Sequence, residues 1–118
     1  MTLKSMVMEF GMGTDIRGGD HTKAAVRALE NTLRQNSITF AQAFDLPREA
    51  MRVQIAIGVA KPEAVDKSAI AAVLPYGTAE VTVVKGGLDI PRDGGEVTVM
   101  ANAAVTVYLD LPDREPAK

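Results

Sequence analysis

The chain has 118 residues, of which 47% are hydrophobic and 24% are charged, and its formal net charge is −2. This length predicts one domain with a modest buried fraction, and the charge balance, with only 4% aromatic residues, argues against a nucleic-acid partner. The absence of cysteine excludes disulfides, thiolate nucleophiles and cysteine-bound metal sites.

The sequence shows no recognisable targeting signal or membrane-spanning segment. Its N-terminus lacks a basic region followed by a long apolar stretch, and no run approaches the roughly 20 apolar residues of a membrane span. We therefore expect a cytoplasmic protein without a membrane partner.

The first half of the chain predicts a strand, a helix and a second strand. Residues 3–11 have the mixed apolar pattern of a short strand that ends at Gly11. Asp20 is a good N-cap, and residues 22–35 repeat apolar side chains at three- and four-residue spacing, as an amphipathic helix does. Residues 51–60 alternate between apolar and small or polar side chains, which indicates a strand.

The second half predicts a helix and two strands. Pro62 suits the first turn of a helix whose apolar run stops at residues 75–77. Residues 79–85 have the pattern of a valine-rich strand, residues 89–95 carry dense turn chemistry, and residues 96–110 resume the strand pattern. We expect the last two strands to form a hairpin.

This order of elements predicts an α+β domain over residues 1–112, followed by a polar tail over residues 113–118. We expect a single mixed β-sheet with two helices on one face, in the order β-α-β-α-β-β. The arrangement is chorismate-mutase-like by analogy, or ferredoxin-like if residues 36–50, which carry conflicting signals, include a strand. The other face is expected to pack against a second copy, which predicts a homo-oligomer. Its small and polar residues would include Gln54, Ala56, Gly58, Thr98, Asn102 and Thr106.

The candidate ligand site lies where the first strand leads into the first helix. Glycine lets a backbone approach a ligand closely, and a helix start offers unpaired N–H groups and the positive end of a dipole. The glycines of this loop either hold a phosphate or carboxylate in a backbone nest or merely permit positive φ in a tight turn. The predicted ligand-binding residues are Gly11, Gly13, Arg17, Gly18, Thr22, Lys23, Lys85 and Asn102.

Two of these residues lie far from the loop in the sequence. Lys85 precedes Gly86 and Gly87 at the end of a predicted parallel strand, where open sheets bind ligands, although a simple turn also explains this motif. Asn102 interrupts an apolar strand, so its amide either serves a structural or subunit contact or binds a ligand. A pocket shared between subunits would bring either residue towards the loop.

Candidate catalytic groups are few. Asp15 is the candidate general base, with a metal ligand and a loop-organising carboxylate as alternatives. His21 is the only histidine, so no metal site is predicted, and we expect it at the surface of the first helical turn. Ile16 stands where a dinucleotide fingerprint has its third glycine, which argues against an NAD site. No cofactor is assigned, and both an enzyme and a binding protein stay open.

The glycine motif, Gly11, Gly13, Asp15 and Gly18, resembles the N-terminal Gly-x-Gly-x-Asp-x-His-Gly signature of a small bacterial and plant family of conserved hypothetical proteins, the Lin-type family. Further similar segments are residues 22–28, 71–77, 84–87 and 100–107. Arg17 replaces the signature histidine, so a role in proton transfer or metal binding would be lost, whereas anion binding would survive. The resemblance implies which residues form a site, but it implies no reaction.

Two hypotheses about function follow. In the first, the chain is a homo-oligomer that binds a small anionic metabolite at the glycine-rich loop. In the second, it is a non-catalytic structural or regulatory oligomer with no small-molecule site, in which the glycines shape the loop and Asp15 closes it.

Overall fold

The computed structural model describes residues 2–35, 51–74 and 78–111. Within these ranges the strands are β1 (Thr2–Asp15), β2 (Met51–Val59), β3 (Thr78–Lys85), β4 (Leu88–Pro91) and β5 (Val97–Leu111). The α-helices are α1 (His21–Gln35) and α3 (Lys67–Ala71), and the 3-10 turns are η2 (Pro62–Ala64) and η3 (Asp93–Gly95). None of the described helices is both long and apolar enough to cross a membrane.

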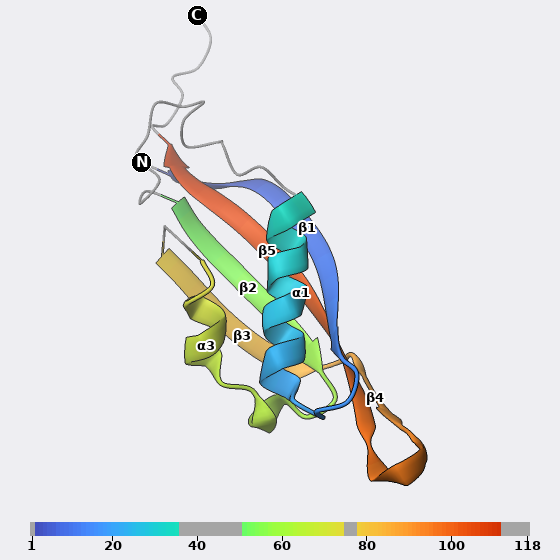
Figure 1. The fold of residues 1–118 in the computed structure, drawn as a ribbon. Coiled ribbons are helices and arrows are strands. Elements are labelled where there is room, and N and C mark those ends of the chain that lie inside the picture. The colour runs from blue at the N-terminus through green and yellow to red at the C-terminus, as the bar shows by residue number, and fades with distance from the viewer. Residues whose placement is uncertain (1, 36–50, 75–77, 112–118) are drawn as a thin grey trace, which may run out of the picture.

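The strands form one mixed sheet, as the sequence predicts. Its strand order is β1-β5-β2-β3, and the short strand β4 pairs with β5. Strand β5 is antiparallel to both β1 and β2, whereas β2 and β3 are parallel. Strands β1 and β2 therefore run in the same direction with β5 inserted between them, and the β4–β5 ribbon projects from one end of the sheet (Figure 1).

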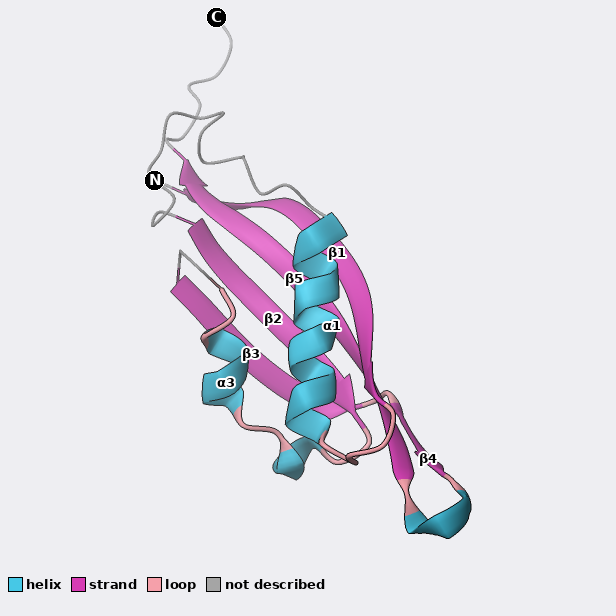
Figure 2. Cartoon of the chain, viewed as in Figure 1, coloured by secondary structure: helices cyan, strands magenta, loops and turns pink. Residues whose placement is uncertain are grey.

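Both helices cover the same face of the sheet, which confirms the predicted α+β architecture (Figure 2). Helix α1 packs across β1 and β5, and α3 packs against β3. The alternation in β2 turns every second side chain towards α1 and α3, where apolar burial supplies the main stabilisation of the fold. The fully buried core residues include Ala24, Ala28, Leu29, Val53, Ile55, Ile57, Ile70, Val99, Ala101 and Val107.

Two glycines of β1 allow α1 to approach the sheet closely. A Cβ at Gly13 would overlap the backbone of Ala28 and would lie 2.6 Å from the carbonyl oxygen of Ala24, and a Cβ at Gly11 would overlap the side chain of Thr32. Neither glycine has a positive φ, so their role here is close packing. Strand β1 continues through both glycines to Asp15, and the prediction that it ends at Gly11 is wrong.

The predicted hairpin between the last two strands is wrong. Strand β3 pairs with β2, and the hairpin partner of β5 is β4, which was expected to be a turn. The inward side chains of β5 explain this position, because Val99, Val105 and Val107 are at most 1% exposed and so suit a strand with neighbours on both sides.

The second predicted helix is divided into η2 and α3. Pro62 starts η2, in agreement with its expected place in a first turn, but a new helix begins where the carboxylate of Asp66 accepts a hydrogen bond from the backbone N–H of Ser68, at 2.9 Å. The unassigned residues 36–50, the turn at 75–77 and the polar tail lie outside the described residues.

Candidate functional site

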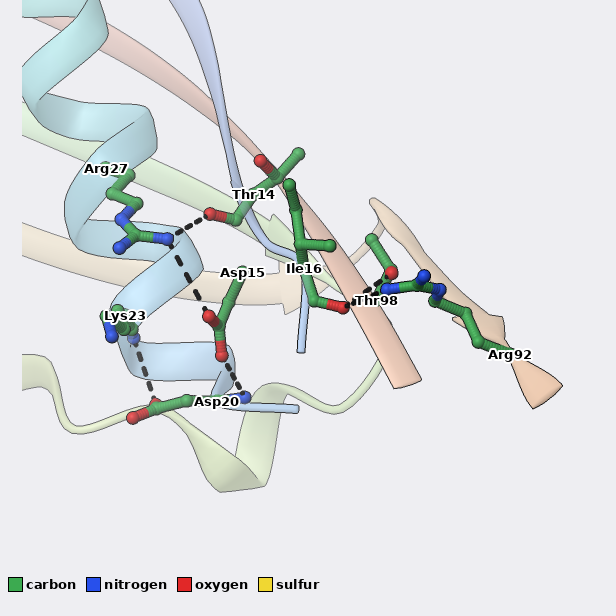
Figure 3. A network of polar contacts seen from close by, with 8 residues as sticks. All are labelled: Thr14, Asp15, Ile16, Asp20, Lys23, Arg27, Arg92 and Thr98. Carbon is green, nitrogen blue, oxygen red and sulfur yellow. Dashed lines mark hydrogen bonds and ion pairs between the residues drawn. The ribbon is translucent and has the colours of Figure 1, made fainter. Parts of the chain in front are cut away.

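The loop between β1 and α1 is organised by the carboxylate of Asp15 (Figure 3). Asp15 is only 5% exposed, and its Oδ2 accepts a hydrogen bond from the backbone N–H of Asp20 at 2.9 Å. Its Oδ1 lies 3.7 Å from Nη1 of Arg27, which also donates a 2.7 Å hydrogen bond to the carbonyl oxygen of Thr14. These contacts join the end of β1 to the start of α1 and compensate the burial of the charge.

Asp20 caps α1, as its position in the sequence predicts. Its Oδ1 accepts a hydrogen bond from the backbone N–H of Lys23 at 3.0 Å, and its carbonyl oxygen accepts one from Ala24 at 3.1 Å. A negative charge therefore already faces the positive end of the helix dipole, the position that the sequence had suggested for an anionic ligand. Gly19, just before the cap, has a φ of 62°, which glycine adopts without strain.

Two arginines adjoin the same loop. Nη1 of Arg92 lies 3.4 Å from the carbonyl oxygen of Ile16, which also accepts a 2.7 Å hydrogen bond from the hydroxyl of Thr98 (Figure 3). Arg92 further pairs with Glu96 at 3.8 Å. Arg17 follows Ile16 directly, and its side chain is exposed. The projecting β4–β5 ribbon thus brings a second guanidinium to the loop, which the sequence pattern did not reveal.

His21, which is buried, pairs with the partly buried Asp89, whose side chain is 19% exposed. Its Nε2 lies 2.9 Å from both carboxylate oxygens of Asp89, and the histidine is only 7% exposed. The predicted surface position of His21 is therefore wrong, because β4 carries Asp89 over the first turn of α1. The partners are 68 residues apart, and the one sequence signal was the apolar pair Leu88 and Ile90 on either side of Asp89, the alternation of a short strand.

Thr22 and Lys23 occupy the first turn of α1. The hydroxyl of Thr22 donates to the carbonyl oxygen of Ala64 at 3.3 Å and accepts from the backbone N–H of Asp66 at 2.9 Å. It therefore connects α1 to the segment between η2 and α3. The side chain of Lys23 is exposed.

The remaining predicted site residues lie away from the loop. Lys85 ends β3, at the opposite side of the sheet from β1, and is exposed. Asn102 is also exposed, and its neighbours Ala101 and Ala103 face the helices, so its side chain lies on the other face of the sheet. One chain by itself does not bring Lys85 or Asn102 to Arg17.

The helix-free face of the sheet is the second region with functional potential. Register between the strands places its side chains in three cross-strand rows. The rows are Met8-Thr106-Gln54-Glu80, Phe10-Ala104-Ala56-Thr82 and Met12-Asn102-Gly58-Val84. Five of the six small or polar residues predicted for this face lie in these rows, whereas Thr98 lies in the β4–β5 ribbon, where its hydroxyl bonds to the carbonyl oxygen of Ile16. The large apolar side chains at the margins of the face were not anticipated.

A hollow of about 270 Å³ lies on this face, over the first two rows. Met8 and the small side chains of Ala56 and Ala104 supply its apolar lining, and Gln54, Glu80, Thr82 and Thr106 supply its polar lining. In the part of the chain that the structure describes, no group of three or more His, Asp or Glu side chains is arranged to hold a metal ion.

Comparison with known proteins agrees with this fold. A crystal structure of an FtsZ-like protein of unknown function from Nostoc punctiforme matches with a TM-score of 0.77 and 34% sequence identity, over 94% of this chain and 99% of that one. No curated protein matches. Residues 5–107 match a family of conserved hypothetical proteins, Lin0512. The match extends from β1 into β5 and includes both the loop and the helix-free face, so the chain belongs to the Lin0512 family.

Proposed function

We propose that this protein works as a homo-oligomer whose subunits pack through the helix-free face of the sheet. The observation that carries the proposal is the exposure of three large apolar side chains along β1. Met8, Phe10 and Met12 are 55%, 63% and 51% exposed, and Val84 on β3 is 50% exposed at the other margin. Contiguous exposed apolar groups on one face are typical of an interaction surface.

The dimensions of this face suit a second copy as its partner. Four strands at a spacing of about 4.8 Å and about eight paired residues at about 3.4 Å each give a flat area of roughly 500 Å². Because side chains project from this plane, the accessible area is larger than the flat area and approaches the roughly 800 Å² that each partner buries in a standard interface. Glu80, in the first row, and Arg52, one row beyond it, give this face charges of both signs, which permits complementary contacts between two copies.

Sedimentation velocity over a range of concentrations tests the proposal. The wild-type chain is expected to sediment as an oligomer, and Phe10→Glu is expected to sediment as a monomer, because a carboxylate would be desolvated in the interface. Ile16→Glu is the matched control, since Ile16 is 55% exposed but lies in the loop. A monomeric wild type, or dissociation by Ile16→Glu and not by Phe10→Glu, contradicts the proposal.

A second candidate function, the binding of a small anionic metabolite, is favoured by the arginines at the loop. Because Asp20 occupies the start of α1, we place the anion at Arg17 and Arg92 rather than on the helix N-terminus. The contacts of Asp15 favour a loop-organising role over that of a general base.

Thermal-shift titration with inorganic phosphate and with succinate tests the anion site. Binding to the native state is expected to raise Tm in the wild type, with a smaller rise in Arg17→Ala and Arg92→Ala. Arg34→Ala is the control, because Arg34 is also exposed but lies in the last turn of α1. Equal shifts in all four proteins would indicate a nonspecific salt effect and remove this candidate.

A further inference from the structure

The hollow on the helix-free face holds a buried hydroxyl that needs a partner. Thr106 is only 8% exposed and lies between Met8 on β1 and Gln54 on β2 in the first cross-strand row. Within the described residues, no hydrogen bond is formed by its hydroxyl, and Thr106 is one of the residues that line the hollow. A buried polar group without a hydrogen bond costs free energy, so a ligand or water that forms a hydrogen bond with this hydroxyl removes that cost.

The charge of the hollow indicates the sign of the charge that a ligand should carry. Glu80 is the only ionisable side chain that lines it, and among the described residues Glu80 forms no ion pair. Gln54 lies beside Glu80 in the strand register, and Thr82 is the next residue of β3 on this face. These groups offer one anionic acceptor together with neutral hydroxyl and amide groups, so they favour a ligand that carries hydrogen-bond donors and positive charge.

The shape of the hollow restricts the ligand further. Its floor is formed by Ala56 and Ala104, which are register partners, and Met8 forms an apolar side. A volume of about 270 Å³ lies just below the usual range for small-molecule sites, roughly 300 to 1,000 Å³. It therefore suits a short alkyl chain, packed on the alanines, with a polar group at its end.

We propose that this hollow is a binding site for a small alkylamine, whose ammonium group pairs with Glu80 and whose methylene groups pack on Ala56, Ala104 and Met8. The amine competes with water for the hydroxyls of Thr82 and Thr106. This site goes beyond the proposed oligomer, because one chain supplies the whole hollow. Pairing of two copies would close it and strengthen the charge interaction by excluding water.

Isothermal titration calorimetry with butylamine tests the site. Wild-type protein is expected to bind it, whereas 1-butanol, which has the same chain length and no charge, is expected to bind at least about tenfold more weakly. Glu80→Gln is expected to reduce the affinity for butylamine by about tenfold or more, and Thr106→Val by a smaller factor. Glu63→Gln, an exposed carboxylate in η2, is the matched control and should leave the affinity unchanged.

Circular dichroism confirms that each variant is folded before titration, and light scattering reports the mass with and without the amine. No binding by the wild type, or equal affinity in the wild type and Glu80→Gln, overturns the site. Absence of amine binding in an intact oligomer overturns only the amine site. Amine binding by a monomeric wild type overturns only the proposed assembly.

Discussion

The two faces of the sheet use the same strands for different purposes. On the covered face, Gly11 and Gly13 admit the backbone of α1, and the buried side chains leave little space for change. On the helix-free face, Phe10 and Met12 from the same strand are exposed beside small residues and a hollow. Alternate residues of one strand therefore stabilise the chain on one face and, on the other, form the surface that we propose as the subunit interface.

The largest expected effect is that of a methyl group on the covered face. Gly13→Ala is expected to destabilise the protein by about 3 kcal/mol or more, because the new Cβ overlaps the backbone of Ala28. Thermal unfolding should show a fall in Tm of at least about 10 °C. Gly58→Ala is the control on the helix-free face, where the Cβ would lie 3.4 Å from the Cα of Gly86, an ordinary contact. A similar loss in both variants would contradict the contrast between the faces.

The second effect concerns the pair of the buried His21 and the partly buried Asp89. Removing one partner by Asp89→Ala is expected to cost about 2 kcal/mol, because the ring of His21 then stays buried without its acceptor. A double-mutant cycle on urea unfolding measures the coupling between the two side chains. The exposed pair of Arg92 and Glu96 provides the comparison and should couple by about 0.5 kcal/mol or less. Equal coupling in both cycles would show that burial does not strengthen the first pair.

A smaller effect is expected at the start of α1. Asp20→Ala removes the acceptor for the backbone N–H of Lys23 and should destabilise the protein by about 1 kcal/mol in urea unfolding. Asp20→Ser keeps a capping oxygen and should retain most of the stability. If both variants lose the same amount, the charge of Asp20 matters more than its hydrogen bond.

The smallest effect on stability is expected at the exposed margin of the helix-free face. Phe10→Ser should change the free energy of unfolding by no more than about 0.5 kcal/mol at concentrations low enough to prevent association. Phe10 is 63% exposed, so its replacement leaves no cavity in the core. A loss of several kcal/mol would show that this face contributes to the stability of a single chain.

The regular elements with clear periodicity could be predicted, and those that depend on distant partners could not. The alternation of β2, the amphipathic pattern of α1 and the cap at Asp20 are local signals, and each is confirmed. Strand β4 has only four residues, and the turn-forming residues beside it led to the prediction of a turn instead of a strand. Its pairing with β5, and hence the burial of His21, depends on contacts across the sequence.

The candidate site shows the same division. The sequence placed Arg17, Gly18, Thr22 and Lys23 together, because they are adjacent in the chain. It could not show that the hydroxyl of Thr22 is already bonded to Ala64 and Asp66, or that Arg92 reaches the loop from another strand. Asn102 and Lys85 remain predictions as ligand-binding residues, since neither adjoins the loop within one chain.

The sequence by itself determined the α+β class and which side chains of β2 face the helices. The reason is that successive residues of a strand point to opposite faces, so the spacing of apolar residues shows directly which face is buried. Only the tertiary structure decided that β5 lies between β1 and β2 and that apolar side chains gather on the helix-free face. Strand order depends on which distant segments exclude most apolar surface from water together, and that sum is a property of the packed chain rather than of any local segment.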